Sequence, residues 1–82
     1  MNITMHPVES SQIAEIGHDE ATNTLRIKFT GRGSVYDYQN FTRPEFEAFM
    51  AAKSKGGHFI KNIKHESKKY PYRKVAEEKA AA

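Results

Sequence analysis

One stretch of strict alternation between apolar and polar side chains constrains the fold more than any other part of the sequence. Residues 24–29, TLRIKF, place Leu25, Ile27 and Phe29 at every second position, with a cation between each pair. Successive side chains of a β-strand point to opposite faces of a sheet, so this spacing predicts a strand with one buried face. The rest of the chain must therefore supply neighbouring strands and a layer that covers that face.

Two further strands are expected, one on each side of this stretch. Residues 11–18 carry two isoleucines and an alanine, and residues 35–39 follow the short sequence GRGS at 31–34. The glycines of GRGS can take the positive φ that a tight turn between strands requires. Residues 1–7 show little periodicity and are expected to form an irregular N-terminal arm. We therefore predict a three-stranded antiparallel β-meander.

The sequence changes to a helical pattern after residue 41. TRPE at 42–45 fits a capping box with proline in the first turn of a helix. Residues 46–53 repeat apolar side chains at i, i+3 and i+4, which gives one buried helix face. The glycine pair at 56–57 ends this helix, and residues 59–63 predict a second short one. The expected fold is α+β, with two short C-terminal α-helices packed against the meander.

Length, composition and charge limit the classes of function. A chain of 82 residues has room for one domain, expected over residues 8–75, with an alanine-rich tail at 76–82 that should fray. There is no cysteine and no apolar run near the roughly 20 residues that cross a bilayer, so we expect a cytoplasmic protein without a membrane partner. Residues 53–74 hold eight lysines and arginines against Glu66 alone, although the whole chain carries only +3. Such concentrated positive charge indicates an anionic partner.

Several short motifs lie in a fixed order along residues 8–75. They are SSQI at 10–13, IGHD at 16–19, TLRIKF at 24–29, YDY at 36–38, SKG at 54–56 with Phe59 and Ile63, and YPYR at 70–73. In this order they resemble the KTSC domain, a module named for its occurrence at the C-terminus of some lysyl-tRNA synthetases. His18 is a departure, because the family often has an aromatic residue there. The resemblance implies a free-standing bacterial or bacteriophage member of the family, for which RNA binding has been suggested.

Cationic and aromatic side chains in the C-terminal third are the candidates for binding nucleic acid. Lysines and arginines neutralise phosphates, and aromatic rings stack on the bases of single strands. The candidate residues are Lys55, Lys61, Lys64, Lys68, Lys69, Tyr70, Tyr72, Arg73 and Lys74, with Tyr36 and Tyr38 from the central motif and His58 or His65 as extra donors. The alternatives are an acidic protein surface as the partner, or a solvated helix face followed by a basic tail.

The tyrosines allow two interpretations. Tyr36 and Tyr38 are two residues apart, so on a strand they share a face. That face either stacks on bases, as in RNA-recognition folds, or packs on the helices at the edge of the core. The sequence alone does not fix the strand register that decides between these two interpretations. Of Tyr70 and Tyr72, at least one is expected to pack in the domain rather than to stack on a ligand.

Signals for other kinds of site are weak. Ser54, Lys55 and the Gly57 amide form a candidate local anion site, with a tight turn between helices as the alternative. The four histidines lack the i, i+3 or i, i+4 spacing of metal ligands on one helix face. No sequence context orders a nucleophile and a base, so no metal, cofactor or catalysis is expected.

Together these observations predict a non-catalytic nucleic-acid-binding module, most of all for RNA, that uses the basic C-terminal third. The alternative is a small protein-interaction module, possible in a phage-type protein, that docks on a host enzyme such as RNA polymerase. A third interpretation is a structural accessory domain with no ligand of its own. A monomer or a weak homodimer is expected.

Overall fold

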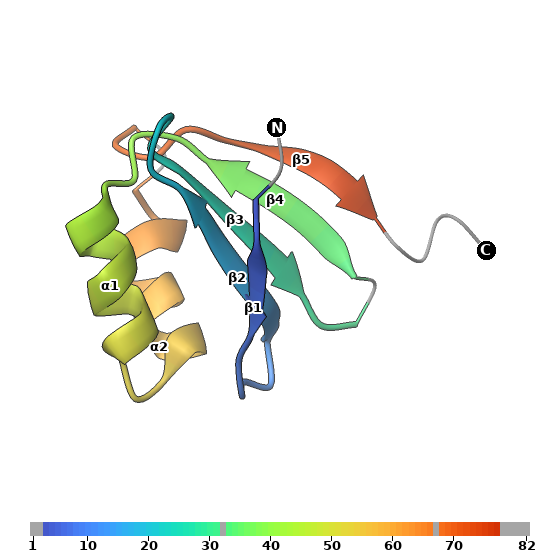
Figure 1. Ribbon diagram of the computed structural model, residues 1–82. Helices are drawn as coiled ribbons and strands as arrows, with labels where there is room; N and C mark the ends of the chain where they lie inside the picture. The colour runs from blue at the N-terminus through green and yellow to red at the C-terminus, as the bar shows by residue number, and fades with distance from the viewer. Residues whose placement is uncertain (1–2, 32, 67, 78–82) are drawn as a thin grey trace.

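The computed structural model describes residues 3–31, 33–66 and 68–77. Its sheet is an antiparallel meander in which five strands lie side by side in chain order. The strands are β1 (Met5–Pro7), β2 (Ile13–Asp19), β3 (Thr24–Phe29), β4 (Ser34–Tyr38) and β5 (Tyr72–Glu77). Between β4 and β5 the chain forms the helices α1 (Arg43–Ala51) and α2 (Lys55–Phe59) and the π-helix η1 (Ile60–Lys64), which continues α2 directly. Figure 1 shows the helices beside the β2 side of the sheet, with β5 at the far edge.

The α+β class and the two helices are as predicted, but the expected number of strands is wrong. The glycine pair at 56–57 lies within α2, whereas α1 already ends at Ala51. The three predicted strands correspond to β2, β3 and β4, and the sheet gains an edge strand on each side. β1 lies in the stretch expected to be irregular, and three residues are too few to show a period. β5 pairs with β4 across the whole helical insertion, a long-range pairing that a local pattern does not reveal. The expected tail at 76–82 lies outside the described residues beyond Glu77.

The register of β3 and β4 decides which way the central tyrosines point. Leu25 is opposite Tyr38 and Ile27 is opposite Tyr36. Directly opposed residues in an antiparallel pair share a face, and both aliphatic partners are fully buried. Tyr36 and Tyr38 therefore lie on the helix-covered face of the sheet, where Tyr38 is buried and Tyr36 is half-buried.

The core lies between this face and the helices. Its strand residues come mainly from β2 and β3, and its helix residues from one face each of α1 and α2–η1. The buried apolar residues are Ile13, Ile16, Leu25, Ile27, Tyr38, Phe41, Phe46, Phe49, Phe59, Ile63 and Tyr70. The predicted capping box is confirmed, because the Thr42 amide donates to Glu45 Oε1 at 2.8 Å. This cap fixes the start of α1 and, with it, the helical layer.

Two positions on β2 show how closely the strands and helices pack. At Gly17, which pairs with Met5 of β1, an added Cβ would lie 2.6 Å from the Thr4 carbonyl oxygen, so a larger residue requires the neighbouring chain to shift. His18 stacks on Phe46 at a centroid distance of 5.1 Å and bonds through Nε2 to the Phe41 carbonyl oxygen. His18 thus packs as an aromatic ring at the edge of the core. Among the described helices, none has the length and apolar character needed to cross a membrane.

Candidate nucleic-acid interface

Five aromatic rings form a closed circuit on the helix side of the sheet, near β5. Each ring contacts the next, and the last contacts the first. The centroid distances are 5.9 Å for Phe29–Tyr36, 6.0 Å for Tyr36–Tyr72, 5.6 Å for Tyr72–Tyr38, 5.7 Å for Tyr38–Phe59 and 5.3 Å for Phe59–Phe29. The circuit lines an open cavity of about 520 Å³ together with Gln12, Ile60, Lys64 and His65. We call this cavity the aromatic hollow.

The rings of the aromatic hollow differ in exposure from floor to rim. Tyr38 and Phe59 are buried and form its floor, whereas Phe29 and Tyr36 are half-buried. Tyr72 is 56% exposed, which leaves much of its ring open to solvent at the β5 edge. Burial raises the pKa of Tyr38, and the nearby phenols of Tyr36 and Tyr72 raise it further. The Tyr38 hydroxyl is therefore a neutral donor at physiological pH.

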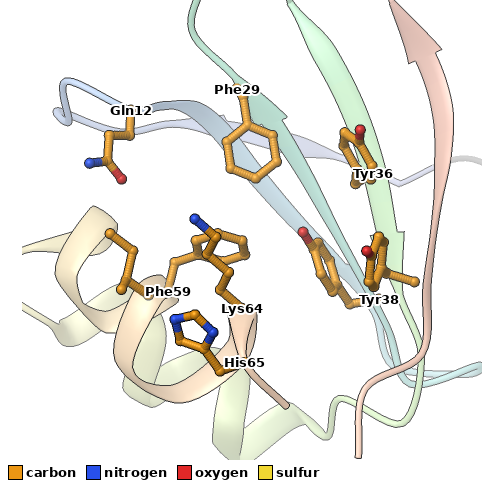
Figure 2. A pocket seen from close by; sticks show the side chains of 9 residues that line it. Gln12, Phe29, Tyr36, Tyr38, Phe59, Lys64 and His65 are labelled. Carbon is orange, nitrogen blue, oxygen red and sulfur yellow. The ribbon is translucent and has the colours of Figure 1, made fainter. Parts of the chain in front are cut away.

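The polar side of the aromatic hollow comes from the helical segment. Figure 2 shows Phe29, Tyr36 and Tyr38 on the sheet facing Phe59, Lys64 and His65 across the cavity. In a π-helix the hydrogen bonds run from i to i+5, and such turns are frequent at functional sites. Residues four and five apart then share a side, and Ile60, Lys64 and His65 accordingly line one cavity.

Five candidate lysines gather on α2, η1 and the turn that leads to β5. They are Lys55, Lys61, Lys64, Lys68 and Lys69, which we call the cationic segment. Lys61, Lys64 and Lys68 are exposed. Lys55 donates from Nζ to the Ala52 carbonyl oxygen at 2.6 Å, which ties it to the end of α1. The cationic segment therefore presents these three lysines to solvent, together with Lys69, which is exposed but paired with Glu45.

Lys69 and Tyr70 have structural contacts. Lys69 Nζ lies 3.5 Å from Glu45 Oε2 and 5.2 Å from the centre of the Tyr70 ring. Tyr70 is 4% exposed, and its hydroxyl donates to Glu45 Oε2. Tyr70 thus packs in the domain, as expected of at least one of the two tyrosines in this motif, while Tyr72 remains available.

The two cations of β5 are divided between the faces of the sheet. Arg73 pairs with Asp37, which is on the face turned away from the helices, and Lys74 pairs with Tyr36. Neighbouring residues of a strand point to opposite faces, so Arg73 and Tyr72 do not act on the same ligand surface. The structure brings together Lys64 with Tyr36, Tyr38 and Tyr72, and separates Arg73 from them.

The candidate anion site is occupied by internal contacts. The Gly57 amide donates to Ser54 Oγ at 3.0 Å, an N-cap contact of the short helix α2. The Lys55 ammonium is bound to the Ala52 carbonyl oxygen. The groups that were expected to bind an anion therefore stabilise the turn between the helices. No group of three or more potential metal ligands occurs among the described residues.

Sequence reasoning missed Gln12, Phe29 and Phe59 as lining residues of the hollow. Phe29 and Phe59 carried only the apolar periodicity of a strand and a helix, which indicates burial and no more. The missing information was the pairing of β5 with β4, which sets Tyr72 opposite Tyr38 and completes the circuit of rings.

Comparisons with known proteins agree with this architecture. The family model of the KTSC domain matches residues 9–70. A protein from Tsukamurella paurometabola is 41% identical over 59 residues, which cover 72% of this chain and 85% of that protein. The crystal structure of a KTSC domain protein from Yersinia pestis is similar with a TM-score of 0.82 at 33% identity, covering 92% of this chain and all of that one.

Proposed function

The chain belongs to the KTSC domain family, and we propose that it is a non-catalytic module that binds nucleic acid, RNA above all, through its cationic segment. The observation that supports this most is the position of the lysines. Five of them lie on one continuous stretch of helix and turn, with Glu66 as its single acidic residue. Its chemistry suits a phosphate backbone, because lysines bind phosphates and release the counterions condensed on them. The absence of cysteine suits action in the reducing cytoplasm.

The exposed lysines set the expected strength of the salt dependence. If Lys61, Lys64 and Lys68 each neutralise one phosphate, the slope of log K against log salt is about −2 for a single strand. Lys69 contributes less, because Glu45 already balances part of its charge. The binding is therefore expected to be modest in affinity and clearly sensitive to salt.

The test is a charge-reversal pair measured by fluorescence anisotropy over a salt titration. Lys61→Glu with Lys68→Glu changes two exposed side chains of the cationic segment. Arg43→Glu with Lys53→Glu is the matched control, since both residues flank the body of α1 outside that segment and both double variants have a formal charge of −1 instead of +3. We expect the first variant to lose RNA binding and the control to keep most of it. Equal losses would mean that only net charge matters and would refute the proposed interface.

A second candidate function is docking on an acidic protein, such as a host enzyme. Ile60 and Tyr72 are large apolar side chains that are 38% and 56% exposed beside the lysines. Exposed apolar groups within a charged rim are typical of protein-binding surfaces. This candidate predicts no RNA binding in the same titration. It also predicts one specific protein partner that the wild type retains and the Tyr72→Ala variant does not.

A further inference from the structure

We propose that the aromatic hollow binds one unpaired base of a single-stranded RNA, with the adjoining phosphate held by Lys64. This inference rests on the proposed function and goes beyond it, because it says where on the protein the RNA binds and that the bound RNA is single-stranded. The cationic segment alone would bind any phosphate backbone, whether paired or not. The aromatic hollow supplies what a backbone-binding surface lacks, which is a set of rings that a base can contact.

The geometry of the hollow suits one planar aromatic ligand. Its volume of about 520 Å³ lies within the range of small-molecule sites, roughly 300 to 1,000 Å³. Tyr36 and Tyr72 form its outer wall with centroids 6.0 Å apart, and Tyr72 is 56% exposed. Aromatic rings prefer offset or edge-on contacts at such spacings, so a base entering the hollow can meet the open side of Tyr72.

A purely structural role does not account for the exposure of these rings. Within the described ranges no element covers the β4–β5 part of the helix-side face beyond Phe59 and η1. An aromatic ring left 56% exposed gives up much of the stabilisation that burial would provide. Three tyrosines with polar tips, rather than phenylalanines, suit a wall that faces both a ligand and water.

The polar groups around the rings match the remaining parts of a nucleotide. Lys64 lies on the rim of the hollow and continues the cationic segment into it. The Gln12 amide offers both donors and an acceptor, and the Tyr38 hydroxyl can donate or accept. Such groups can bond the edge of a base, while the lysine neutralises its phosphate.

These features favour an unpaired base over a duplex. In double-stranded RNA the bases are stacked inside the helix, and proteins contact mainly 2′-hydroxyls and phosphates. A base can enter a cavity between a sheet and a helix only when it is splayed out of the stack. The aromatic hollow thus predicts a preference for single strands that the lysines by themselves do not give.

The experiment compares a short oligouridylate with an RNA duplex carrying the same number of phosphates, at one salt concentration. Tyr72→Ala removes the exposed ring, and Tyr72→Phe keeps it. Val75→Ala is the matched control, because Val75 is on the same strand, is 40% exposed and does not line the aromatic hollow. We expect Tyr72→Ala to weaken oligouridylate binding about 5- to 150-fold, with duplex binding unchanged. Tyr72→Phe and Val75→Ala should bind like the wild type.

Two further measurements keep the test decisive if Tyr72→Ala folds poorly. Lys64→Gln changes an exposed residue of η1 and should weaken binding of the oligouridylate more than binding of the duplex. Titration of the wild type with uridine monophosphate should shift the ring protons of Tyr36 and Tyr72 and needs no variant.

The possible outcomes separate this inference from the proposed function. Salt-dependent binding of both RNAs that Tyr72→Ala leaves intact would overturn the base-binding site and leave the cationic interface standing. Equal losses for the single strand and the duplex would overturn it too. If neither RNA binds at any salt concentration, both proposals are wrong.

Discussion

The contact between Tyr70 and Glu45 joins the turn before β5 to the start of α1. The Tyr70 hydroxyl donates to Glu45 Oε2, while Glu45 Oε1 accepts the Thr42 amide at 2.8 Å and the Thr42 hydroxyl at 3.0 Å. Glu45 therefore accepts hydrogen bonds from the helix cap and, at the same time, from the hydroxyl of Tyr70, which is 4% exposed. This contact holds the segment that carries Lys68 and Lys69 and leads into Tyr72.

The two single substitutions should be costly for different reasons. Tyr70→Phe removes a hydrogen bond to a charged acceptor and should lower the free energy of unfolding by about 1.5–3 kcal/mol. Glu45→Ala removes the cap, about 1 kcal/mol, and leaves the Tyr70 hydroxyl without its acceptor, about 1–3 kcal/mol more. In the double variant no hydroxyl is left unpaired, so the cost falls to that of the cap and of the exposed pair with Lys69. Tyr70→Phe should therefore be neutral or stabilising in the Glu45→Ala background.

Urea denaturation followed by circular dichroism measures all three variants, with linear extrapolation to water. Glu47→Ala is the control on the same helix, because Glu47 makes only an exposed pair with Arg43 and should change stability by less than about 1 kcal/mol. Additive costs of Tyr70→Phe and Glu45→Ala would show that the two groups do not interact and would contradict the proposed contact.

The same contact predicts a pH dependence. Burial raises the pKa of Glu45, but the hydrogen bonds from Tyr70 and Thr42 and the charge of Lys69 outweigh it, so the pKa is lowered. The resulting stability is present above the ordinary value of 4.5 and is lost as the pH falls through the folded-state pKa. The Glu45→Ala variant should lose less stability than the wild type on acidification.

Two further predictions concern other parts of the domain. Gly17→Ala places a Cβ 2.6 Å from the Thr4 carbonyl oxygen, so β1 must shift. The free energy of unfolding in urea should therefore fall by about 1–3 kcal/mol, and an unchanged urea midpoint would contradict this packing. Burial, with the nearby charge of Lys55, lowers the pKa of His58, so its stabilisation is present above 6.5 and is lost as the pH falls through the folded-state pKa. His58→Gln should therefore be less sensitive to acidification in this range than the wild type, as thermal unfolding at several pH values can check.

The elements predictable from sequence are those with a local signal. The alternation at Leu25, Ile27 and Phe29 marks β3, and Thr42 with Glu45 marks the start of α1, because each pattern depends only on residues close in the chain. The edge strands carried no such signal. β1 has three residues, and β5 depends on a partner strand that lies before the helices.

The candidate site was predictable in composition but not in arrangement. The concentration of lysines in residues 53–74 is visible in the sequence, and so is the Tyr36–Tyr38 spacing. Their relation to Tyr72 and Phe59 depends on two tertiary facts, the β4–β5 register and the way α2 packs near the sheet. The division between Tyr70, which is buried, and Tyr72, which is exposed, follows from the acceptor that Glu45 provides only to the former.

The most direct test of the proposed function is an amide chemical-shift titration of the wild-type protein with single-stranded RNA at low and high salt. We expect shifts in residues 55–69 and at Tyr36, Tyr38 and Tyr72, all weaker at high salt. Shifts confined to β1 and β2, or shifts that do not change with salt, would contradict it.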